Sequence, residues 1–188
     1  MRLAIAVLTV ALATCAVAAT PALSQSFGEK TGINAAIGIS PRTRDFVREA
    51  TVGGMFEIQS SQLAEQKGDT VAKPFAEHMI TDHTRINGEL KALVDSGKVK
   101  GSVPTALDTS SQIMLDKLKS LNGADFEKQY ADDQVSAHKD AVDLFQRYAK
   151  GGKNADLKAW AAKTLPTLQE HLKMALALAA APQASNSK

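Results

Sequence analysis

Hydrophobic residues recur every three to four positions along most of this chain, which is the spacing of helices that bury one face. The pattern predicts four long helices, over about residues 41–67, 71–96, 125–150 and 155–180, and a shorter one over about 109–121. Runs with the alternating pattern of β-strands are nearly absent. The chain is therefore predicted to be all-α.

Helix-terminating and helix-capping residues set the boundaries of these helices. Ser40-Pro41 is typical of a helix start, with serine as N-cap and proline in the first position. Thr70 is expected to cap the second helix, and Asp108 or Thr109 the short one. The last helix is expected to start near Asn154.

The loop lengths predict how the helices connect. Short loops join the first two long helices and the last two, and short loops make antiparallel neighbours. The segment from about 98 to 124 is long enough to run back along the helices. The predicted fold is a ferritin-like four-helix bundle over residues 41–180, with two antiparallel helical hairpins joined by a long crossover that contains a short extra helix.

The first 24 residues are predicted to be a signal peptide. Arg2 precedes an uncharged run from Leu3 to Ala19, and small residues follow that allow cleavage after Ser24 or Ala18. A transmembrane anchor needs about 20 apolar residues, and this run is shorter and ends at Pro21. Export to the periplasm or secretion after cleavage is the expected outcome.

Lipid anchoring through Cys15 is disfavoured, because Thr14 is a poor residue before a lipidated cysteine. Cys15 is the chain's one cysteine, so the mature chain has neither a disulfide nor a thiolate site. Residues 25–40 are expected to form a flexible leader and residues 181–188 a disordered polar tail.

Charge and hydropathy exclude some partners. The formal net charge is +2, and basic and acidic residues are interspersed, so nucleic acid is not a predicted partner. No second hydrophobic stretch reaches membrane-spanning length, so the mature chain has no predicted transmembrane segment. The remaining partners are a metal ion or an unidentified envelope protein.

One polar residue interrupts the apolar stripe of each long helix. Burying an imidazole or a carboxylate is unfavourable unless it finds a partner, so these four residues are expected to meet. Within each hairpin the two residues differ in depth by four or five positions, about 6–8 Å along the axis, which long side chains can partly bridge. The four residues are Glu57, His83, His138 and His171.

This set predicts a metal site. Imidazole and carboxylate groups are ligands for zinc, iron, manganese and copper ions. No histidine has a Glu or Asp three residues before it, so the Glu-x-x-His pairs of di-iron bundles are missing and a single ion is expected. The alternative is a structural hydrogen-bond network made by the same four side chains.

Further polar groups are placed to support a metal site. Asp82 adjoins His83, Gln134 lies one turn before His138, and Tyr130 lies a further turn back. Such groups can orient the ring nitrogens of metal ligands. His78, away from the stripe, is expected to pair with Asp82 at the surface.

Three segments of the chain resemble one family of exported bacterial proteins, domain of unknown function 4142. They are AEHMITDHTRIN (76–87), FEKQYADDQVSAHKDAVDLF (126–145) and LKAWAAKTLPTLQEHLKMA (157–175). Members are often labelled outer-membrane proteins, a label that this helical pattern does not support. The resemblance implies a ferritin-like four-helix fold in the bacterial envelope, and its characteristic positions include Glu57, Asp82, His83, His138 and His171.

These observations favour an exported bundle that binds one transition-metal ion for metal handling or envelope stress protection. The main alternative is a non-enzymatic envelope interaction or structural module. A third hypothesis is a redox enzyme with an open coordination position on the metal. The sequence favours a non-catalytic role and assigns no catalytic residue, because it lacks H-E-x-x-H, G-x-S-x-G and a phosphate-binding glycine loop.

Overall fold

The computed structural model describes residues 32–181. The predicted signal peptide (1–24), the leader up to residue 31 and the tail from residue 182 lie outside the described residues. The described part contains helices and no strand, which confirms the all-α prediction. Within it, no helix combines the length and the apolar character needed to cross a membrane.

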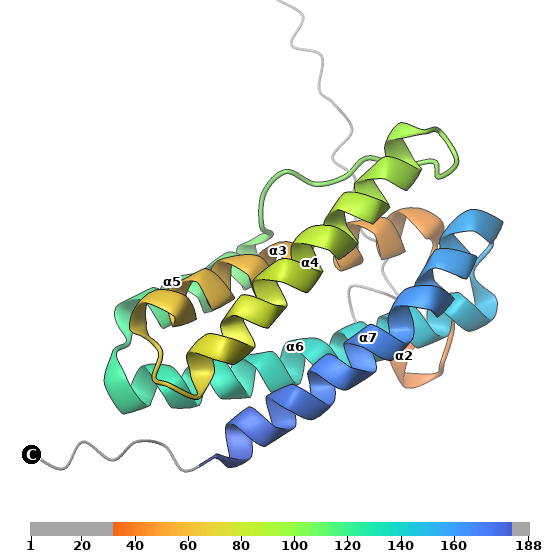
Figure 1. Ribbon diagram of the computed structural model, residues 1–188. Coiled ribbons are helices and arrows are strands. Elements are labelled where there is room, and N and C mark those ends of the chain that lie inside the picture. Colours follow the sequence, from red (N-terminus) through yellow and green to blue (C-terminus); the bar gives the residue numbers. More distant parts are fainter. Residues whose placement is uncertain (1–31, 182–188) are drawn as a thin grey trace, which may run out of the picture.

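Four long helices and two shorter ones make up the described part (Figure 1). The first long helix begins at Thr43, two residues after the predicted start, and α2 lies within the segment expected to be a flexible leader. The helices are α2 (Ile33–Ala36), α3 (Thr43–Lys67), α4 (Ala72–Asp95), α5 (Thr109–Ser120), α6 (Gly123–Gly151) and α7 (Ala155–Ala180).

The predicted cap at Asp108 and the predicted helix start at Asn154 are confirmed, whereas Arg42 and not Ser40 is the N-cap of α3. The Asp108 carboxylate accepts a hydrogen bond from the backbone N–H of Ser111 at 3.0 Å, at the start of α5. The Asn154 side chain accepts one from the N–H of Leu157 at 2.9 Å, at the start of α7. Each bond satisfies a backbone donor that the helix itself leaves unpaired.

The cap of α4 differs from the prediction. The Asp69 carboxylate accepts hydrogen bonds from the backbone N–H groups of Val71 and Ala72, both at 2.8 Å, whereas Thr70 was expected to act as the cap. A carboxylate is a stronger acceptor than a hydroxyl, and its charge also interacts favourably with the helix N-terminus. Asp69 therefore takes the position that the sequence pattern attributed to its neighbour.

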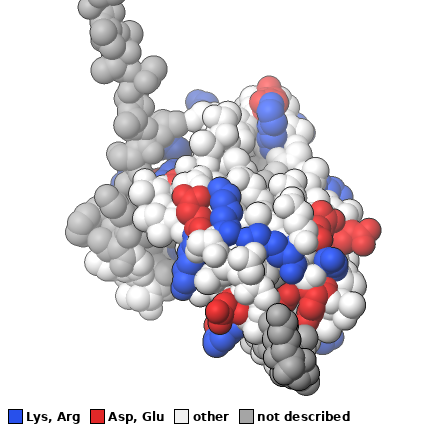
Figure 2. All heavy atoms as spheres, turned by 90° about the vertical axis from the view of Figure 1, so that its left-hand side faces the viewer, with Lys and Arg blue, Asp and Glu red and all other residues white. Residues whose placement is uncertain are grey.

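The long helices pack as two pairs. Helices α3 and α4 form one antiparallel hairpin and α6 and α7 the other, and the hairpins meet where α3 packs on α6 and α4 on α7 (Figure 1). Residues 96–122 connect the hairpins and include α5, which packs on both α3 and α6. Figure 2 shows basic and acidic side chains interspersed on one face of this helical bundle.

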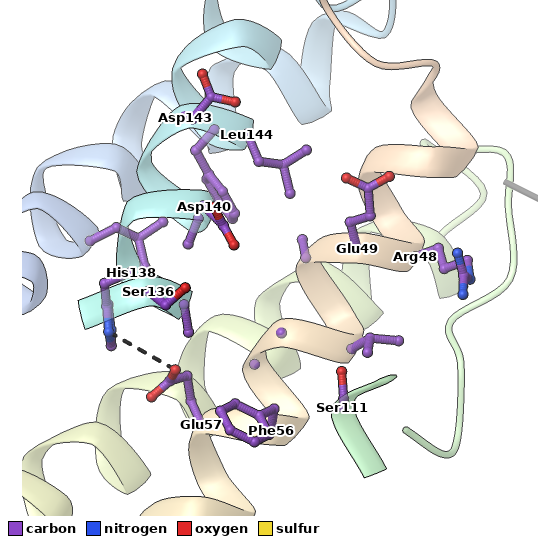
Figure 3. Close-up of a pocket in the computed structure, with 18 of the residues that line it drawn as sticks. Arg48, Glu49, Phe56, Glu57, Ser111, Ser136, His138, Asp140, Asp143 and Leu144 are labelled. Atoms are coloured by element: carbon purple, nitrogen blue, oxygen red, sulfur yellow. Dashed lines mark ion pairs between the residues drawn. The ribbon is translucent and has the colours of Figure 1, made fainter. Parts of the chain in front are cut away.

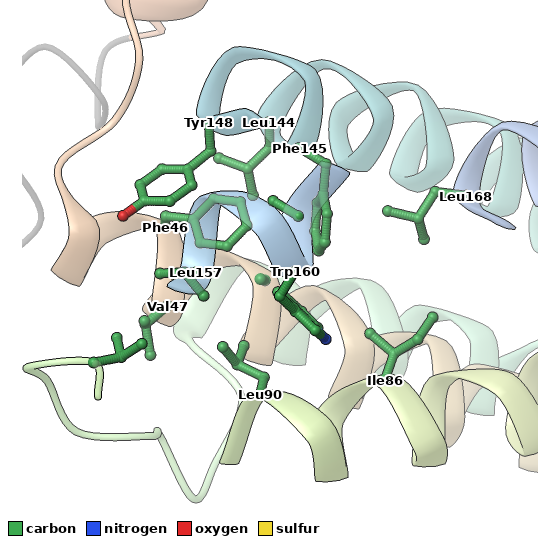
Figure 4. Close-up of a cluster of buried hydrophobic side chains, with 13 residues drawn as sticks. Phe46, Val47, Ile86, Leu90, Leu144, Phe145, Tyr148, Leu157, Trp160 and Leu168 are labelled. Atoms are coloured by element: carbon green, nitrogen blue, oxygen red, sulfur yellow. The ribbon is translucent and has the colours of Figure 1, made fainter. Parts of the chain in front are cut away.

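The apolar core is divided into two clusters. The first contains Phe46, Phe145, Tyr148 and Trp160 (Figure 4), with the Phe46 ring stacked on Tyr148 at a centroid distance of 4.2 Å. The second gathers other buried side chains, including Phe56, Phe75, Met79, Phe126 and Tyr130. On α4, Met79 belongs to the second cluster and Ile86 to the first, so the segment between them passes from one cluster to the other.

Glycines allow a close approach of α3 to α4. A Cβ atom added at Gly54 would lie 2.2 Å from Oδ1 of Asn87 on α4, so a side chain here would displace the asparagine. A Cβ at the adjacent Gly53 would meet nothing within 4 Å. The pair therefore serves two purposes, because Gly54 permits helix packing and Gly53 leaves open space.

We expect Phe46→Ala to lower the free energy of unfolding by about 3–5 kcal/mol, because it removes a large buried ring and leaves a cavity. Phe46 is 0% exposed and its ring also lies 4.9 Å from that of Phe145, between centroids. Urea denaturation followed by circular dichroism measures the change. Ile113→Ala is the control, since Ile113 is 65% exposed, and an equal loss in both variants would contradict this packing.

Candidate metal centre

Each long helix contributes one buried polar side chain to the middle of the bundle. Glu57 comes from α3, His83 from α4, His138 from α6 and His171 from α7, and none is more than 4% exposed. On α4, His83 follows the buried Met79 by four residues and precedes the buried Ile86 by three, so its side chain shares their face. The helical period thus places these residues between the two apolar clusters.

The three histidine rings lie against one another. Their centroids are 5.4 Å apart for His83 and His138, 5.2 Å for His83 and His171, and 5.4 Å for His138 and His171. One ring nitrogen from each lies within 4.8 Å of the other two. The difference of four or five residues in depth within each hairpin does not keep them apart.

The closest ring nitrogens have the separation of two ligands on one ion. Nε2 of His83 is 3.3 Å from Nε2 of His138. Two nitrogens bound at 2.0–2.1 Å to a tetrahedral ion would lie about 3.3–3.4 Å apart. The same distance also fits a hydrogen bond in which Nε2 of His83 carries the proton and Nε2 of His138 accepts it.

In two of the rings, one nitrogen donates a hydrogen bond to a fixed acceptor, and we call it the outer nitrogen of that ring. Nδ1 of His138 donates to the backbone carbonyl of Gln134 at 2.9 Å, which leaves the lone pair on Nε2. Nε2 of His171 donates to the Asp82 carboxylate at 2.9 Å, which leaves Nδ1 buried and without a hydrogen bond. Metal-binding histidines are commonly oriented by a carbonyl or a carboxylate in this way.

Of the three supporting residues suggested by the sequence, two form hydrogen bonds with a histidine ring and one does not. Asp82 contacts His171 on α7 rather than the adjacent His83, and it also lies 3.3 Å from Nε2 of the exposed His78. Gln134 acts through its backbone carbonyl, while its side-chain amide donates to Ser60 at 3.2 Å. The remaining residue, Tyr130, is hydrogen bonded to Ser61 at 2.8 Å and not to a histidine.

Glu57 lies beside His138 and not next to the ring nitrogens through which the histidines face one another. Its Oε1 is 4.0 Å from Nδ1 of His138, the nitrogen that faces away from His83 (Figure 3). Neither carboxyl oxygen makes a hydrogen bond of normal geometry. Burial raises the pKa of Glu57 to about 8, and the nearby Gln134 side chain offsets this only in part. The carboxyl group is therefore largely protonated at neutral pH.

Burial has the opposite effect on the pKa of the histidines, because it disfavours their charged form. It lowers the pKa of His83 well below 6.5, with help from the neighbouring rings, and that of His138 to about 4. Burial also lowers the pKa of His171, although the Asp82 carboxylate partly opposes this. All three imidazoles are thus neutral at pH 7, which is the form that binds metal ions.

One protein family matches this chain over most of its length. The model of the family Domain of unknown function (DUF4142) matches residues 28–178. The chain belongs to this family. The resemblance read from the three sequence segments is confirmed. No curated protein and no solved structure matches the chain.

In this DUF4142 protein a cleft leads toward the buried histidines. It has a volume of about 640 Å³, and its lining includes Glu57, His83 and His138 at one end and exposed residues of α3 and α6 at the other (Figure 3). Sequence reasoning missed this cleft, because its lining comes from all six described helices and from residues far apart along the chain. The local signal in the sequence is the Gly53-Gly54 pair in the middle of a predicted helix.

We expect the metal-free protein to be most stable near pH 6.5. Below this value the unfolded chain takes up protons on the three histidines that the folded chain resists, so the free energy of unfolding falls toward pH 4. Above it, the unfolded chain has lost the Glu57 proton that the folded chain keeps up to about pH 8, so stability falls as the pH rises.

Urea denaturation in the presence of chelator, at pH 5, 6.5 and 8.5, measures both effects. Glu57→Gln should remove the loss of stability between pH 6.5 and 8.5 and keep the loss below pH 6.5, because it cannot ionise. A free energy of unfolding that increases from pH 6.5 to pH 5 would contradict the neutral state of the histidines.

Proposed function

We propose that this protein is an exported ferritin-like four-helix bundle that binds one transition-metal ion in its core. The ligands are His83, His138 and His171, and Glu57 is the neighbouring carboxyl group. Two antiparallel hairpins and a long connection containing α5 support the ferritin-like arrangement. The predicted signal peptide supports a location in the periplasm.

The observation that carries this proposal is the convergence of three neutral imidazoles with their nitrogens oriented. Two of the rings donate their outer N–H to fixed acceptors, and two Nε2 atoms lie 3.3 Å apart. These are the ring orientation and the spacing that a bound ion needs. Neutral imidazole suits zinc, copper and iron, and the nearby carboxyl group is compatible with manganese as well.

The alternative of a purely structural network is less well supported by the hydrogen bonds. Native proteins pair the great majority of their buried polar groups. Here Nδ1 of His171, both carboxyl oxygens of Glu57 and Oε1 of Gln134 have no hydrogen-bond partner among the described residues. Several unpaired groups around three rings favour an ion over a self-sufficient network.

The cellular role that fits this site is metal handling or protection of the envelope under stress. A single buried ion with protein ligands on three sides is suited to storage, buffering or delivery of a metal. A second group of possible ligands, His78, Asp82 and His171, shares His171 with the first, so the proposal stops at the binding of one ion.

Elemental analysis of the purified protein after metal-replete expression tests the site. We expect about one transition-metal ion per chain in the wild type and loss of at least nine-tenths of it in the His83→Ala/His138→Ala variant, because two of three imidazole ligands are gone. His78→Gln is the matched control, since the side chain of His78 is 53% exposed, and it should keep its metal.

Circular dichroism verifies that the double variant is still helical, and the single variant His138→Gln replaces it if it is not. Metal well below one ion per chain in the wild type and both variants would exclude the site. Equal metal content in all three proteins would place the ion elsewhere.

A second measurement distinguishes the metal site from the structural network. A ligand present at 100 times its Kd stabilises a folded protein by about 2.7 kcal/mol, which corresponds to several degrees in Tm for a domain of this size. We therefore expect chelator to lower the Tm of the wild type and to leave that of His83→Ala/His138→Ala unchanged. An unchanged wild-type Tm would support the structural module instead.

A further inference from the structure

The cleft joins the surface to the proposed ligands. Gly53, Ser136 and Asp140 line it and are exposed, whereas Glu57 and His138 line it and are buried (Figure 3). Most lining residues come from α3 and α6, and α2, α4, α5 and α7 contribute the rest. A solute that enters between these helices reaches the Glu57 carboxyl and the His138 ring along a cleft whose walls combine these polar groups with apolar side chains such as Phe56 and Leu144.

The walls of the cleft carry an excess of acidic groups. Five carboxyl groups line it, against two arginines. Both arginines are already paired, Arg48 with Asp108 at 3.3 Å and Arg147 with Asp143 at 2.7 Å. Asp140 makes no ion pair or hydrogen bond with a described residue, so its negative charge faces the cleft and the solvent. Clefts lined by one sign of charge concentrate ions of the opposite sign.

The buried end of the cleft supplies a second, independent feature. Glu57 is only 3% exposed, lines the cleft, and has two carboxyl oxygens without a hydrogen bond. A polar group buried without a partner is unfavourable, and a cation that displaces the proton of this carboxyl group supplies the missing interaction. Glu57 is thus placed as the first protein ligand that an entering ion meets before the histidines.

The volume of the cleft is large enough for an ion that has kept its water. Six water molecules occupy about 180 Å³ at about 30 Å³ each, well within the cleft volume of about 640 Å³. Gly53 contributes to this space, because a Cβ at that position would meet nothing within 4 Å. A glycine in mid-helix is unfavourable relative to alanine by about 1 kcal/mol, so the open space comes at a cost in helix stability.

The other approach to the histidines is less suitable for a cation. It leads past the exposed His78 to Asp82 and then to His171. The Asp82 carboxylate is already bound to three groups, His78, His171 and Arg85, the last at 3.3 Å. Because it is shared among these groups, the Asp82 carboxylate has less unpaired negative charge than Asp140 with which to attract a cation.

We propose that divalent transition-metal ions enter the core through the acidic cleft between α3 and α6, attracted by Asp140 and passed to the histidines by Glu57. This inference rests on the proposed metal-binding function. On this proposal, ions enter through the cleft and do not enter past His78 and Asp82.

Stopped-flow measurement of Co²⁺ uptake by the chelator-treated full chain tests the route, because bound Co²⁺ absorbs visible light. We expect Asp140→Asn to slow association at least about threefold at low salt, with the difference vanishing near 1 M salt as the charge is screened. Gly53→Met should slow uptake at all salt concentrations, since its side chain fills the cleft. Both variants should still reach one Co²⁺ per chain.

Two variants serve as controls. Gly88 is also a mid-helix glycine whose added Cβ would meet nothing within 4 Å, and it does not line the cleft, so Gly88→Met should take up Co²⁺ at the wild-type rate. His78→Gln alters the opposite approach and should also leave the rate unchanged.

The outcomes separate the two proposals. Wild-type protein that binds no Co²⁺ overturns the metal site itself. Wild-type binding with unchanged rates in both Asp140→Asn and Gly53→Met overturns the entry route and leaves the site intact. Slower uptake in His78→Gln alone overturns the cleft in favour of the face formed by α4 and α7.

Discussion

The structure depends on a layer of polar side chains buried across the middle of an apolar bundle. Two hydrophobic clusters lie on either side of this layer, and each long helix passes from one cluster to the other through it. Because little solvent reaches the rings, every polar atom in the layer must find its partner within the protein or in a bound ion. This requirement sets which residues can occupy the helix positions at that level.

Burial is the main cause of the opposite protonation behaviour of the four central groups. It disfavours charge, so it raises the pKa of Glu57 and lowers that of the three histidines. The result is a set of neutral groups in which two rings donate an N–H to fixed acceptors, while Nδ1 of His171 and the Glu57 carboxyl oxygens have no hydrogen-bond partner among the described residues. A cation would satisfy these atoms together, which is why the same arrangement supports both the metal site and the acidic route that leads to it.

The helical elements could be predicted from the sequence because their determinants are local. The apolar period, the glycine breaks and the Asp108 and Asn154 caps each involve residues within a few positions of one another. The sequence pattern predicts Thr70 as the cap of α4, but Asp69 caps it. Both residue types can cap a helix, and only the loop geometry decides between them. The pairing of Asp82 with His171 joins residues 89 positions apart, so local spacing could not reveal it.

The sequence by itself determined the all-α class, the four polar interruptions of the apolar stripes and the family, because these depend on the order and period of residues in one chain. The tertiary structure decided which polar residues meet. Three rings converge, while Glu57 lies on the outer side of His138, because side-chain direction and helix packing set distances of a few ångströms. It also decided that a cleft reaches them, since a cavity exists only between surfaces that the folded chain brings together.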